Sequence, residues 1–537
     1  FHFEMGGNSH KALIYSLLAA EQAKTQFALN VALEKYRTAK ALSHTGSNHI
    51  QYRVLSGMGH ALLLSGRYQD AYDTLESAAT HANNERDRIK TKARQGEIIY
   101  KTRSLNESTQ ALEQLLFELG YPIPRGQLQT LIEITISSVQ LKWLNLRRPN
   151  KLSECKPDWK TDLTIRILMQ VCYPTLFSDG MKALWASKKA LRLASNRSSD
   201  AILSSALSIE SLVSSRFLPR LQRIQSLSNQ AIQLAHDLND NALTAEAWHL
   251  QAASVGALAP SQGRKSSEEA IQRYHQLGDA WRLTYGHAFL AIIQSYLGEF
   301  AECIAGSQKA FESAISYGQH RLAQTVLKPW ATATGGRLRF DELKSQVIVV
   351  TDDLQSTVLL NVAESIWHRH HARTAESLVS AELAFSIMRD YWPFSPLVSV
   401  AYPNLVQSLR HHADAVQERD PKQSERIRTR ALKLARRGVL VQRIARLDLA
   451  YALRELGQCY ADIGKIGKAH KVVLRSCRVA VERNANYEHA QSLYVYGRLS
   501  EKLRIPEASR QIQEAERLLA GFESQIDEAI RRQQEIT

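Results

Sequence analysis

The segment Gly263-Arg264-Lys265-Ser266-Ser267 is the nearest approach in this sequence to a phosphate-binding loop. Such a loop follows a strand, ends in Gly-Lys-Ser/Thr, and surrounds the phosphate with the backbone N–H groups of a glycine-rich turn. Here Leu258 stands where the first glycine should be, Arg264 separates the glycine from the lysine, and no strand pattern precedes the segment. We therefore predict a helix-capping loop and not a nucleotide site.

Histidines and paired aspartates are the next residues that could do chemistry. Five histidines form two groups: His368, His370 and His371, and His411 and His412. Metal-binding histidines on a helix are spaced by four residues and need an acidic third ligand, and the first group has neither feature. We interpret these histidines as solvated or partner-facing. Asp352-Asp353 precedes Leu354 and has the composition of a helix N-terminus, which favours capping over acid–base catalysis.

The cysteines and tryptophans also lack a catalytic pattern. The five cysteines are odd in number and show no CxxC spacing: Cys155, Cys172, Cys303, Cys459 and Cys477. Neither a disulfide framework nor a zinc site is indicated, and a reducing cytoplasm suits this usage. Five tryptophans are interpreted as packing between repeats and not as a ligand cage: Trp248, Trp281, Trp330, Trp367 and Trp392. We predict no catalytic residue, cofactor or metal.

The net charge of +15 is concentrated in one run, Arg419 to Arg446, where ten Lys/Arg oppose two acidic residues for a local charge of +8. Apolar residues at helical spacing interrupt the run, and it contains no aromatic residue for base stacking. A solvated helix face, a docking site for an acidic protein and a nucleic-acid site are all compatible with it, in that order of preference. The candidate partner-binding residues are Arg426, Arg430, Lys433, Arg436, Arg437, Arg443 and Arg446.

These residues must be positioned by a helical repeat, because the chain contains copies of a two-helix unit. The clearest copy has Gly59 and Gly66 seven residues apart, followed by Ala71 and Ala78 on one face of the next helix. Gly59 permits close helix approach and Gly66 ends the first helix. A second strong copy has Gly457 and Gly464 at the same interval, with Ala469 and Val473 after them.

Weaker copies fill the chain, so we predict an all-α superhelix of tetratricopeptide-like helix pairs, roughly 14 of them at about 38 residues each. Marker density divides it into N-terminal repeats (1–124), degenerate repeats (125–240), middle repeats (241–390) and C-terminal repeats with an exit helix (391–537). The stretches 125–215 and 319–390 are weakly marked but keep the helical apolar period.

Three segments interrupt the pattern. Leu119-Gly120-Tyr121-Pro122-Ile123-Pro124 predicts a helix stop followed by a turn, and Arg147 to Asp158 predicts an exposed loop. Gln346 to Val350 is rich in β-branched residues, but a lone strand has no partner here, so we expect helix or linker.

The sequence resembles the helical-repeat region of large bacterial signalling ATPases. The residues that carry this resemblance are His2-Phe3, Gly7, Lys11-Ala12, Tyr15, Ala19-Ala20 and Ala23, the turn Leu119 to Pro124, and the ending Ala515-Glu516-Arg517 through Phe522 to Arg531-Arg532-Gln533-Gln534-Glu535. In that family a P-loop ATPase, often behind a Ser/Thr kinase or cyclase domain, precedes the repeats, and GAF and histidine kinase or similar output modules can follow. The resemblance implies a piece of a longer protein and no catalytic residue in these 537 residues.

The expected function is a non-catalytic protein–protein interaction and signal-relay scaffold within such a signalling ATPase or kinase. Its partners would be proteins, peptides or neighbouring domains of the same chain, whereas nucleic acid is disfavoured. No run approaches the roughly 20 apolar residues that span a bilayer, so we expect a cytoplasmic protein without membrane contact. The alternative is a superhelix that senses a small molecule and controls an attached ATPase or kinase.

Overall fold

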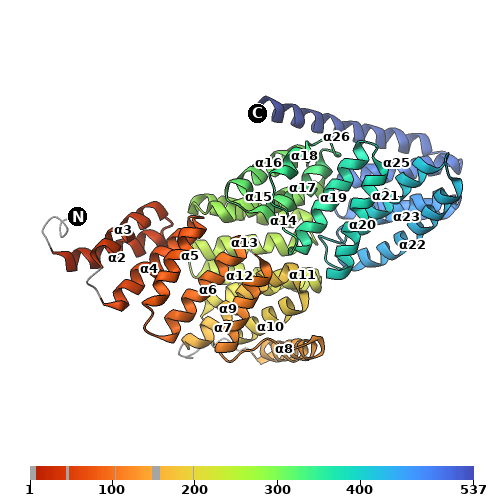
Figure 1. Cartoon of the computed structure of the whole chain (residues 1–537). Coiled ribbons are helices and arrows are strands. Elements are labelled where there is room, and N and C mark those ends of the chain that lie inside the picture. Colours follow the sequence, from red (N-terminus) through yellow and green to blue (C-terminus); the bar gives the residue numbers. More distant parts are fainter. Residues whose placement is uncertain (1–7, 44–46, 103, 148–157, 198, 537) are drawn as a thin grey trace. The chain divides into compact units, whose positions relative to one another are not determined.

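The computed structural model is almost entirely helical (Figure 1). Helices make up 83% of it, and the part of the chain that it describes contains no strand. It describes residues 8–43, 47–102, 104–147, 158–197 and 199–536. The 25 helices within these ranges correspond to twelve pairs and one further helix, close to the predicted number. The predicted all-α, tetratricopeptide-like fold is confirmed.

The helices are α2 (Ser9–Thr25), α3 (Leu29–Leu42), α4 (Asn48–Leu64), α5 (Tyr68–Thr80), α6 (Glu85–Thr102), α7 (Leu105–Glu118), α8 (Gln127–Arg147), α9 (Trp159–Ser178), α10 (Gly180–Arg197), α11 (Asp200–Phe217), α12 (Leu221–Asp237), α13 (Asn241–Val255) and α14 (Pro260–Leu277). They continue with α15 (Ala280–Leu297), α16 (Phe300–Ser316), α17 (His320–Ala333), α18 (Phe340–Ser345), α19 (Leu354–His370), α20 (Thr374–Tyr391), α21 (Ala401–Val416), α22 (Pro421–Ala445), α23 (Leu449–Asp462), α24 (Ile466–Glu482), α25 (Asn486–Lys502) and α26 (Ala508–Ile536).

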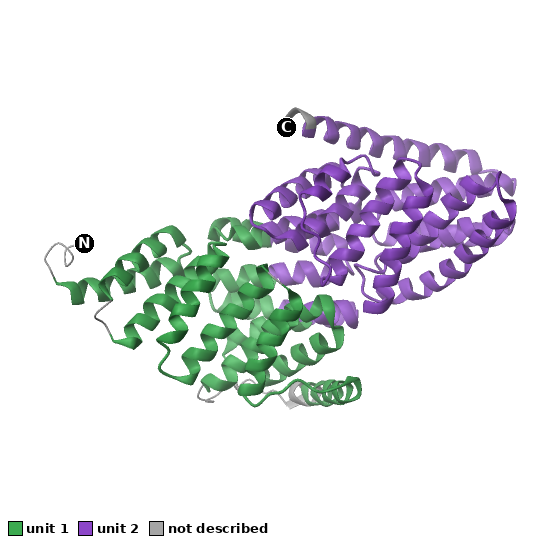
Figure 2. Cartoon of the chain, viewed as in Figure 1, with its two compact units in different colours: residues 1–210, 230–247, 270–283 green, residues 211–229, 248–269, 284–537 purple. Residues whose placement is uncertain are grey.

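The chain forms two compact units (Figure 2). Unit 1 contains residues 1–210, 230–247 and 270–283, and unit 2 contains residues 211–229, 248–269 and 284–537. Helices α11 to α15 contribute residues to both units. The four-segment division predicted from marker density stays a prediction.

The small residues of the repeat lie where two helices of a pair touch. A Cβ atom placed on Gly59 would lie 2.7 Å from the Leu75 side chain of α5, and Ala71 is fully buried beside it. In the second strong copy, a Cβ on Gly457 would overlap the Val473 side chain of α24. The predicted register of both copies is therefore correct, because each glycine faces the second helix of its own pair.

The turns within these pairs use a left-handed residue. Gly66 and Gly464 both have φ of +75° and directly follow the first helix of each pair. A residue without a Cβ adopts this conformation at little cost, so the chain can reverse within a few residues. The predicted stop at Leu119 to Pro124 is also present, since α7 ends at Glu118 and Gly120 has φ of +85°.

The weakly marked stretches are helical, as expected, but one pair is incomplete. Helix α18 has only six residues and is followed by an extended segment that runs to Asp353. This segment includes Gln346 to Val350, which is a linker and not a strand in a sheet. The Gln324 side chain takes the role of a strand partner, since its Oε1 accepts the Val350 N–H at 2.8 Å. The predicted loop from Arg147 to Asp158 lies mostly outside the described residues, as do His2, Phe3, Gly7 and Cys155.

Candidate interaction surface

Helix α22 carries the predicted basic residues, and its start follows from local chemistry. The side chain of Asp420 accepts the N–H of Gln423 at 2.9 Å, and Pro421 occupies the first turn, where its missing N–H costs nothing. The inward side is lined by small and apolar residues that pack between α21 and α23: Ala431, Leu434, Ala435, Gly438 and Val439. Because this side is buried, the charged positions between these residues face solvent.

All seven predicted residues are exposed, and we call them the α22 basic face: Arg426, Arg430, Lys433, Arg436, Arg437, Arg443 and Arg446. The spacing from Arg426 through Arg430 and Lys433 to Arg437 places these four on one stripe of the helix. Arg436 and Arg443 lie on the flank of the stripe. Six of the seven predicted residues therefore lie on α22, and Arg446 directly follows the helix as its C-terminal cap.

Most of the charge on the α22 basic face is not neutralised within the chain. Arg430 forms an ion pair with Glu382 at 2.6 Å. Arg436 donates to the Tyr460 hydroxyl at 3.3 Å, and its guanidinium lies 5.5 Å from the Tyr460 ring centroid. Among the described residues, no acidic side chain pairs with the other five: Arg426, Lys433, Arg437, Arg443 and Arg446.

A second basic row, which the sequence analysis missed, lies on α24. Lys468, Lys471, Arg475 and Arg478 are all exposed, and we call them the α24 basic row. Their spacing of three, four and three residues places them on one helix face, opposite Ala469, Val473 and Ala480. This periodicity was visible in the sequence. The row has only four cations, however, and did not stand out beside the ten in Arg419 to Arg446.

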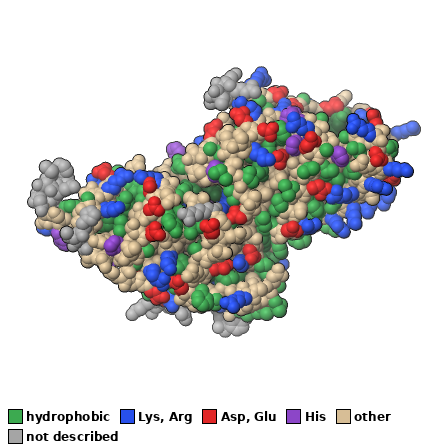
Figure 3. All heavy atoms as spheres, viewed as in Figure 1, with side chains coloured by type: hydrophobic (Ala, Val, Ile, Leu, Met, Phe, Trp, Pro, Cys, Tyr) green, Lys and Arg blue, Asp and Glu red, His purple; other side chains and the backbone are tan. Residues whose placement is uncertain are grey.

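The C-terminal ends of α22 and α24 lie together. Arg483, just after α24, donates through Nη1 to the backbone carbonyl of Arg446 at 2.7 Å. Figure 3 shows Lys and Arg side chains gathered over the right-hand part of unit 2, where Figure 1 places α22. Unit 2 therefore presents two basic helices on its outside.

A buried ionic network lies beneath this surface and links three successive pairs. Arg410 on α21 contacts Glu455 at 3.1 Å and Asp462 at 2.8 Å, both on α23. Arg454, also on α23, contacts Glu455 at 2.8 Å and Glu488 on α25 at 2.7 Å. Burial acts to lower the pKa of Arg454, but the two carboxylates outweigh it and hold this pKa above its ordinary value. The network fixes the pairs that carry the basic helices.

The phosphate-loop candidate is placed differently from the prediction. Gly263 to Ser267 lie inside α14 and not in a capping loop, because Pro260 begins the helix and the helical period continues through them. Gly263 is needed for packing, since a Cβ there would overlap the backbone of Gly256, directly after α13. Ser266 donates to Gln251 Oε1 at 2.8 Å, so its hydroxyl is used within the fold.

The other candidates occupy structural positions. Asp353 caps α19 by accepting the Ser356 N–H at 2.9 Å, which confirms the predicted capping, and burial raises its pKa to about 6. The four described cysteines are buried, and burial raises the pKa of the Cys303 thiol to about 12, which disfavours a nucleophilic thiolate. Within the described ranges no three His, Cys, Asp or Glu residues converge in a way that could hold a metal ion.

The fold and this surface define a helical-repeat chain with a basic outer face. No protein-family model matches the sequence, and no curated protein matches it either. Among solved structures, yeast Tom70 aligns with a TM-score of 0.35 and 11% identity over 94% of this chain and 99% of that one. The hetero-tetramer Cut9-Hcn1 of APC/C aligns with a TM-score of 0.32 and 12% identity over 96% of each chain. None of the described helices is both long and apolar enough to cross a membrane.

Proposed function

We propose that this chain is a non-catalytic, cytoplasmic interaction scaffold and that the α22 basic face docks an acidic protein or peptide. The observation that carries the proposal is the set of five exposed cations, four on α22 and Arg446 directly after it, that have no acidic partner among the described residues. Unpaired cations on a fixed helix attract an acidic partner over about 8 Å at physiological ionic strength and orient it as it docks.

The residue types on the two basic helices favour a protein partner over a nucleic-acid partner. No Phe, Tyr or Trp occurs in α22 or α24, and the ring of His470 on α24 already stacks on Tyr496 with centroids 4.4 Å apart, so neither helix offers a free aromatic platform for a base. Their outward apolar residues are aliphatic: Leu440 and Ile444 on α22, and Val481 on α24. Aliphatic groups beside cations suit an acidic partner that also has an apolar face.

The proposal is tested by charge reversal with a matched control. Lys433→Glu/Arg437→Glu removes two unpaired cations from α22, and Arg37→Glu/Lys40→Glu makes the same change on α3, where both residues are also exposed. We expect poly-glutamate to bind the wild type and the α3 variant, and to bind the α22 variant at least about tenfold more weakly in fluorescence anisotropy. Equal binding by both variants would contradict the proposal. So would tighter binding of duplex DNA than of poly-glutamate at 150 mM salt, roughly the physiological ionic strength.

We further propose that the scaffold relays this binding to catalytic modules of a larger signalling ATPase or kinase. The support for this context is the resemblance carried by the turn Leu119 to Pro124 and by the residues of α26. Co-expression with neighbouring domains of the parent protein, followed by ATPase assay with wild-type and α22-reversed chains, would test it. An ATPase rate that is the same in both would contradict the relay.

A further inference from the structure

The incomplete helix pair of unit 2 leaves a gap in the outer layer of helices. The second helices of the neighbouring pairs, α16 and α20, have 17 and 18 residues, whereas α18 has six. The missing residues correspond to roughly 16 Å of helix. Helix α17 packs directly against both α16 and α19, and residues of α16, α17, α18 and α26 surround one space beside it.

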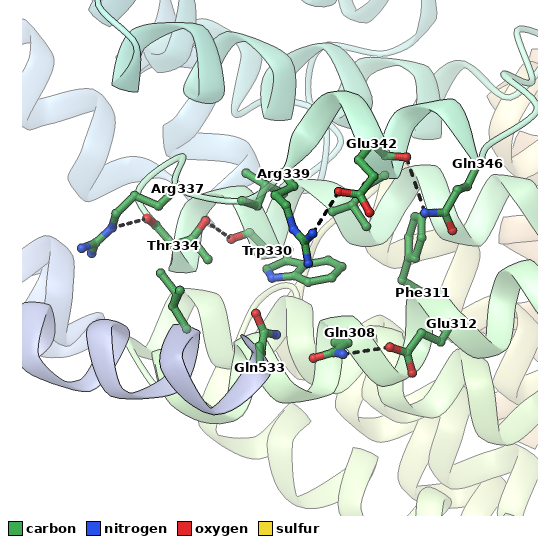
Figure 4. Close-up of a pocket in the computed structure, with 13 residues that line it drawn as sticks. Gln308, Phe311, Glu312, Trp330, Thr334, Arg337, Arg339, Glu342, Gln346 and Gln533 are labelled. Atoms are coloured by element: carbon green, nitrogen blue, oxygen red, sulfur yellow. Dashed lines mark hydrogen bonds and ion pairs between the residues drawn. The ribbon is translucent and has the colours of Figure 1, made fainter. Parts of the chain in front are cut away.

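A pocket of ≈ 200 Å³ lies in this gap (Figure 4). Its apolar wall is formed by Phe311, Trp330, Leu338, Leu343 and Ile530. The Phe311 and Trp330 rings meet edge to face, with centroids 6.0 Å apart. Such a wall favours a flat apolar group, since aromatic pairs of this geometry gain energy beyond the area that they bury.

The rim of the pocket is polar, and both of its arginines are paired with carboxylates. Arg337 pairs with Glu523 and Asp527 at 2.7 Å each, and Arg339 pairs with Glu342 at 3.2 Å. Glu312 accepts the Gln308 side-chain amide at 2.8 Å. An anionic ligand would therefore have to displace existing ion pairs, whereas a neutral ligand would not.

Three glutamines and one indole supply the neutral hydrogen-bonding groups. Gln308, Gln346 and Gln533 lie around the pocket, and Figure 4 shows Gln308 and Gln533 on one side of Trp330 with Arg339 on the other. The Trp330 side chain is 7% exposed, and its Nε1–H has no acceptor. Amide side chains can both donate to and accept from a peptide backbone.

We propose that this pocket receives one aromatic side chain of a peptide segment from a partner protein. Its volume is below the roughly 300–1,000 Å³ of small-molecule and cofactor sites, and a single buried aromatic anchor is the usual centre of a peptide interface. The peptide backbone beside the anchor would bond to the glutamine amides. This site is separate from the α22 basic face and does not depend on it.

Binding at this pocket would also hold α26 in place, because Ile530 and Gln533 form part of the wall. Helix α26 is seated on α16 through Phe522, Ile526 and Ala529, which join the core around Phe300. The side-chain amide of Gln533 donates to the Ile304 carbonyl at 3.4 Å. A bound peptide would add contacts to this end of α26 and slow its local opening.

The test uses the full chain, a plugged variant and a neighbouring control. Gln308→Trp places an indole at the pocket from a partly exposed helix position, and Lys309→Trp places the same group on the adjacent exposed position outside the pocket. Peptides are selected from a displayed random 12-residue library, and their affinity is measured by fluorescence anisotropy. Thermal melts by circular dichroism establish that both variants are folded.

We expect selected peptides to share one aromatic residue and to lose at least about tenfold in affinity for Gln308→Trp, but less than about twofold for Lys309→Trp. Hydrogen exchange of residues 520–533 should slow when peptide binds. The proposal is overturned if replacement of the aromatic residue by alanine leaves binding intact, or if Gln308→Trp binds as well as the wild type. It is also overturned if N-acetyl-tryptophanamide competes as tightly as the peptide, since the site would then recognise a small molecule.

Discussion

Arg454 on α23 holds both carboxylate oxygens of Glu488 on α25, with Nε to Oε1 at 2.7 Å and Nη2 to Oε2 at 3.3 Å. This two-point contact joins successive helix pairs, and Arg454 is only 6% exposed. Buried charges are costly to desolvate, so such a pair sets the register of its neighbours more than it adds net stability. The consequences of breaking it should be large and local.

Arg454→Ala should destabilise α23 and α25 by about 3–5 kcal/mol, because Glu488 would remain buried without its cation and Glu455 would keep only Arg410. The measurement is the opening free energy of these helices from native-state hydrogen exchange, since a long repeat array need not unfold in one step. Arg498→Ala is the control, because Arg498 is exposed and, within the described ranges, its one ion pair is with Glu501 at 2.9 Å. That change should cost at most about 1 kcal/mol. Equal effects of the two changes would contradict the role of the network.

Asp448 predicts a pH dependence of stability. Burial raises its pKa from 3.8 to about 7, with Glu488 acting in the same direction and Lys328 and Arg483 opposing it. Between pH 4 and 7 the folded chain therefore holds a proton that the unfolded chain has released. The stabilising contribution of this group is complete below the unfolded pKa and is lost as pH rises through the folded pKa.

Asp448→Asn should consequently be more stable than the wild type at pH 8, and this advantage should shrink as pH falls toward 5, values on either side of the folded pKa of about 7. Thermal melts of both chains at several pH values provide the comparison. A wild-type stability that does not change relative to the variant between pH 5 and 7 would show that this carboxyl is ionised in the fold.

Two helical glycines should respond oppositely to alanine. A Cβ at Gly457 would overlap Val473, so Gly457→Ala should force α23 and α24 apart at a cost of about 1–3 kcal/mol. Gly521 lies inside α26 with nothing within 4 Å of a built Cβ, so Gly521→Ala should stabilise by about 0.5–1 kcal/mol through helix propensity. Chemical denaturation of the two variants gives the signs. If both substitutions stabilised the chain, α23 and α24 would be packed less tightly than the structure indicates.

The sequence could predict helix pairing but not its exceptions. Gly59 with Ala71, and Gly457 with Val473, are contacts inside one pair, so fixed sequence spacing encodes them. The exposed stripe on α22 was also predictable from spacing, because charged and apolar residues alternate along this helix at the helical period. The short length of α18 was not visible in the sequence. The linker after it bonds through the Val350 N–H to the side chain of Gln324, and no sequence pattern marks that contact.

Contacts between distant segments were also beyond the sequence argument. Arg337 pairs with Asp527, which lies 190 residues further along the chain. No spacing rule relates these two residues, because the bend of the repeats in unit 2 decides which helices meet. The pocket near Trp330 depends on this meeting, so it could be found only in the structure.

The seating of α26 on α16 should depend on apolar packing more than on its ion pairs. Phe522 packs among Phe300 and Tyr487, with ring centroids 5.6 and 5.3 Å away, whereas Glu523 and Asp527 are 56% and 55% exposed where they meet Arg337. Exposed pairs contribute about 0–1 kcal/mol each and weaken in salt. Truncating a partly buried aromatic ring should cost about 2 kcal/mol or more.

We therefore expect Phe522→Ala to speed hydrogen exchange of residues 520–533 by roughly 30-fold or more, and Arg337→Ala, which removes two exposed pairs, to speed it by less than Phe522→Ala does. Raising the salt concentration should bring the exchange rate of the wild type closer to that of Arg337→Ala, because screening weakens the ion pairs that this variant lacks. The additional rate increase caused by Phe522→Ala should stay nearly the same, because screening does not act on ring contacts. If Arg337→Ala released α26 as fully as Phe522→Ala, the ion pairs would be the main attachment. In that case the pocket wall formed by Ile530 would open as ionic strength rises, and peptide binding at the pocket would be salt-sensitive even for a neutral peptide.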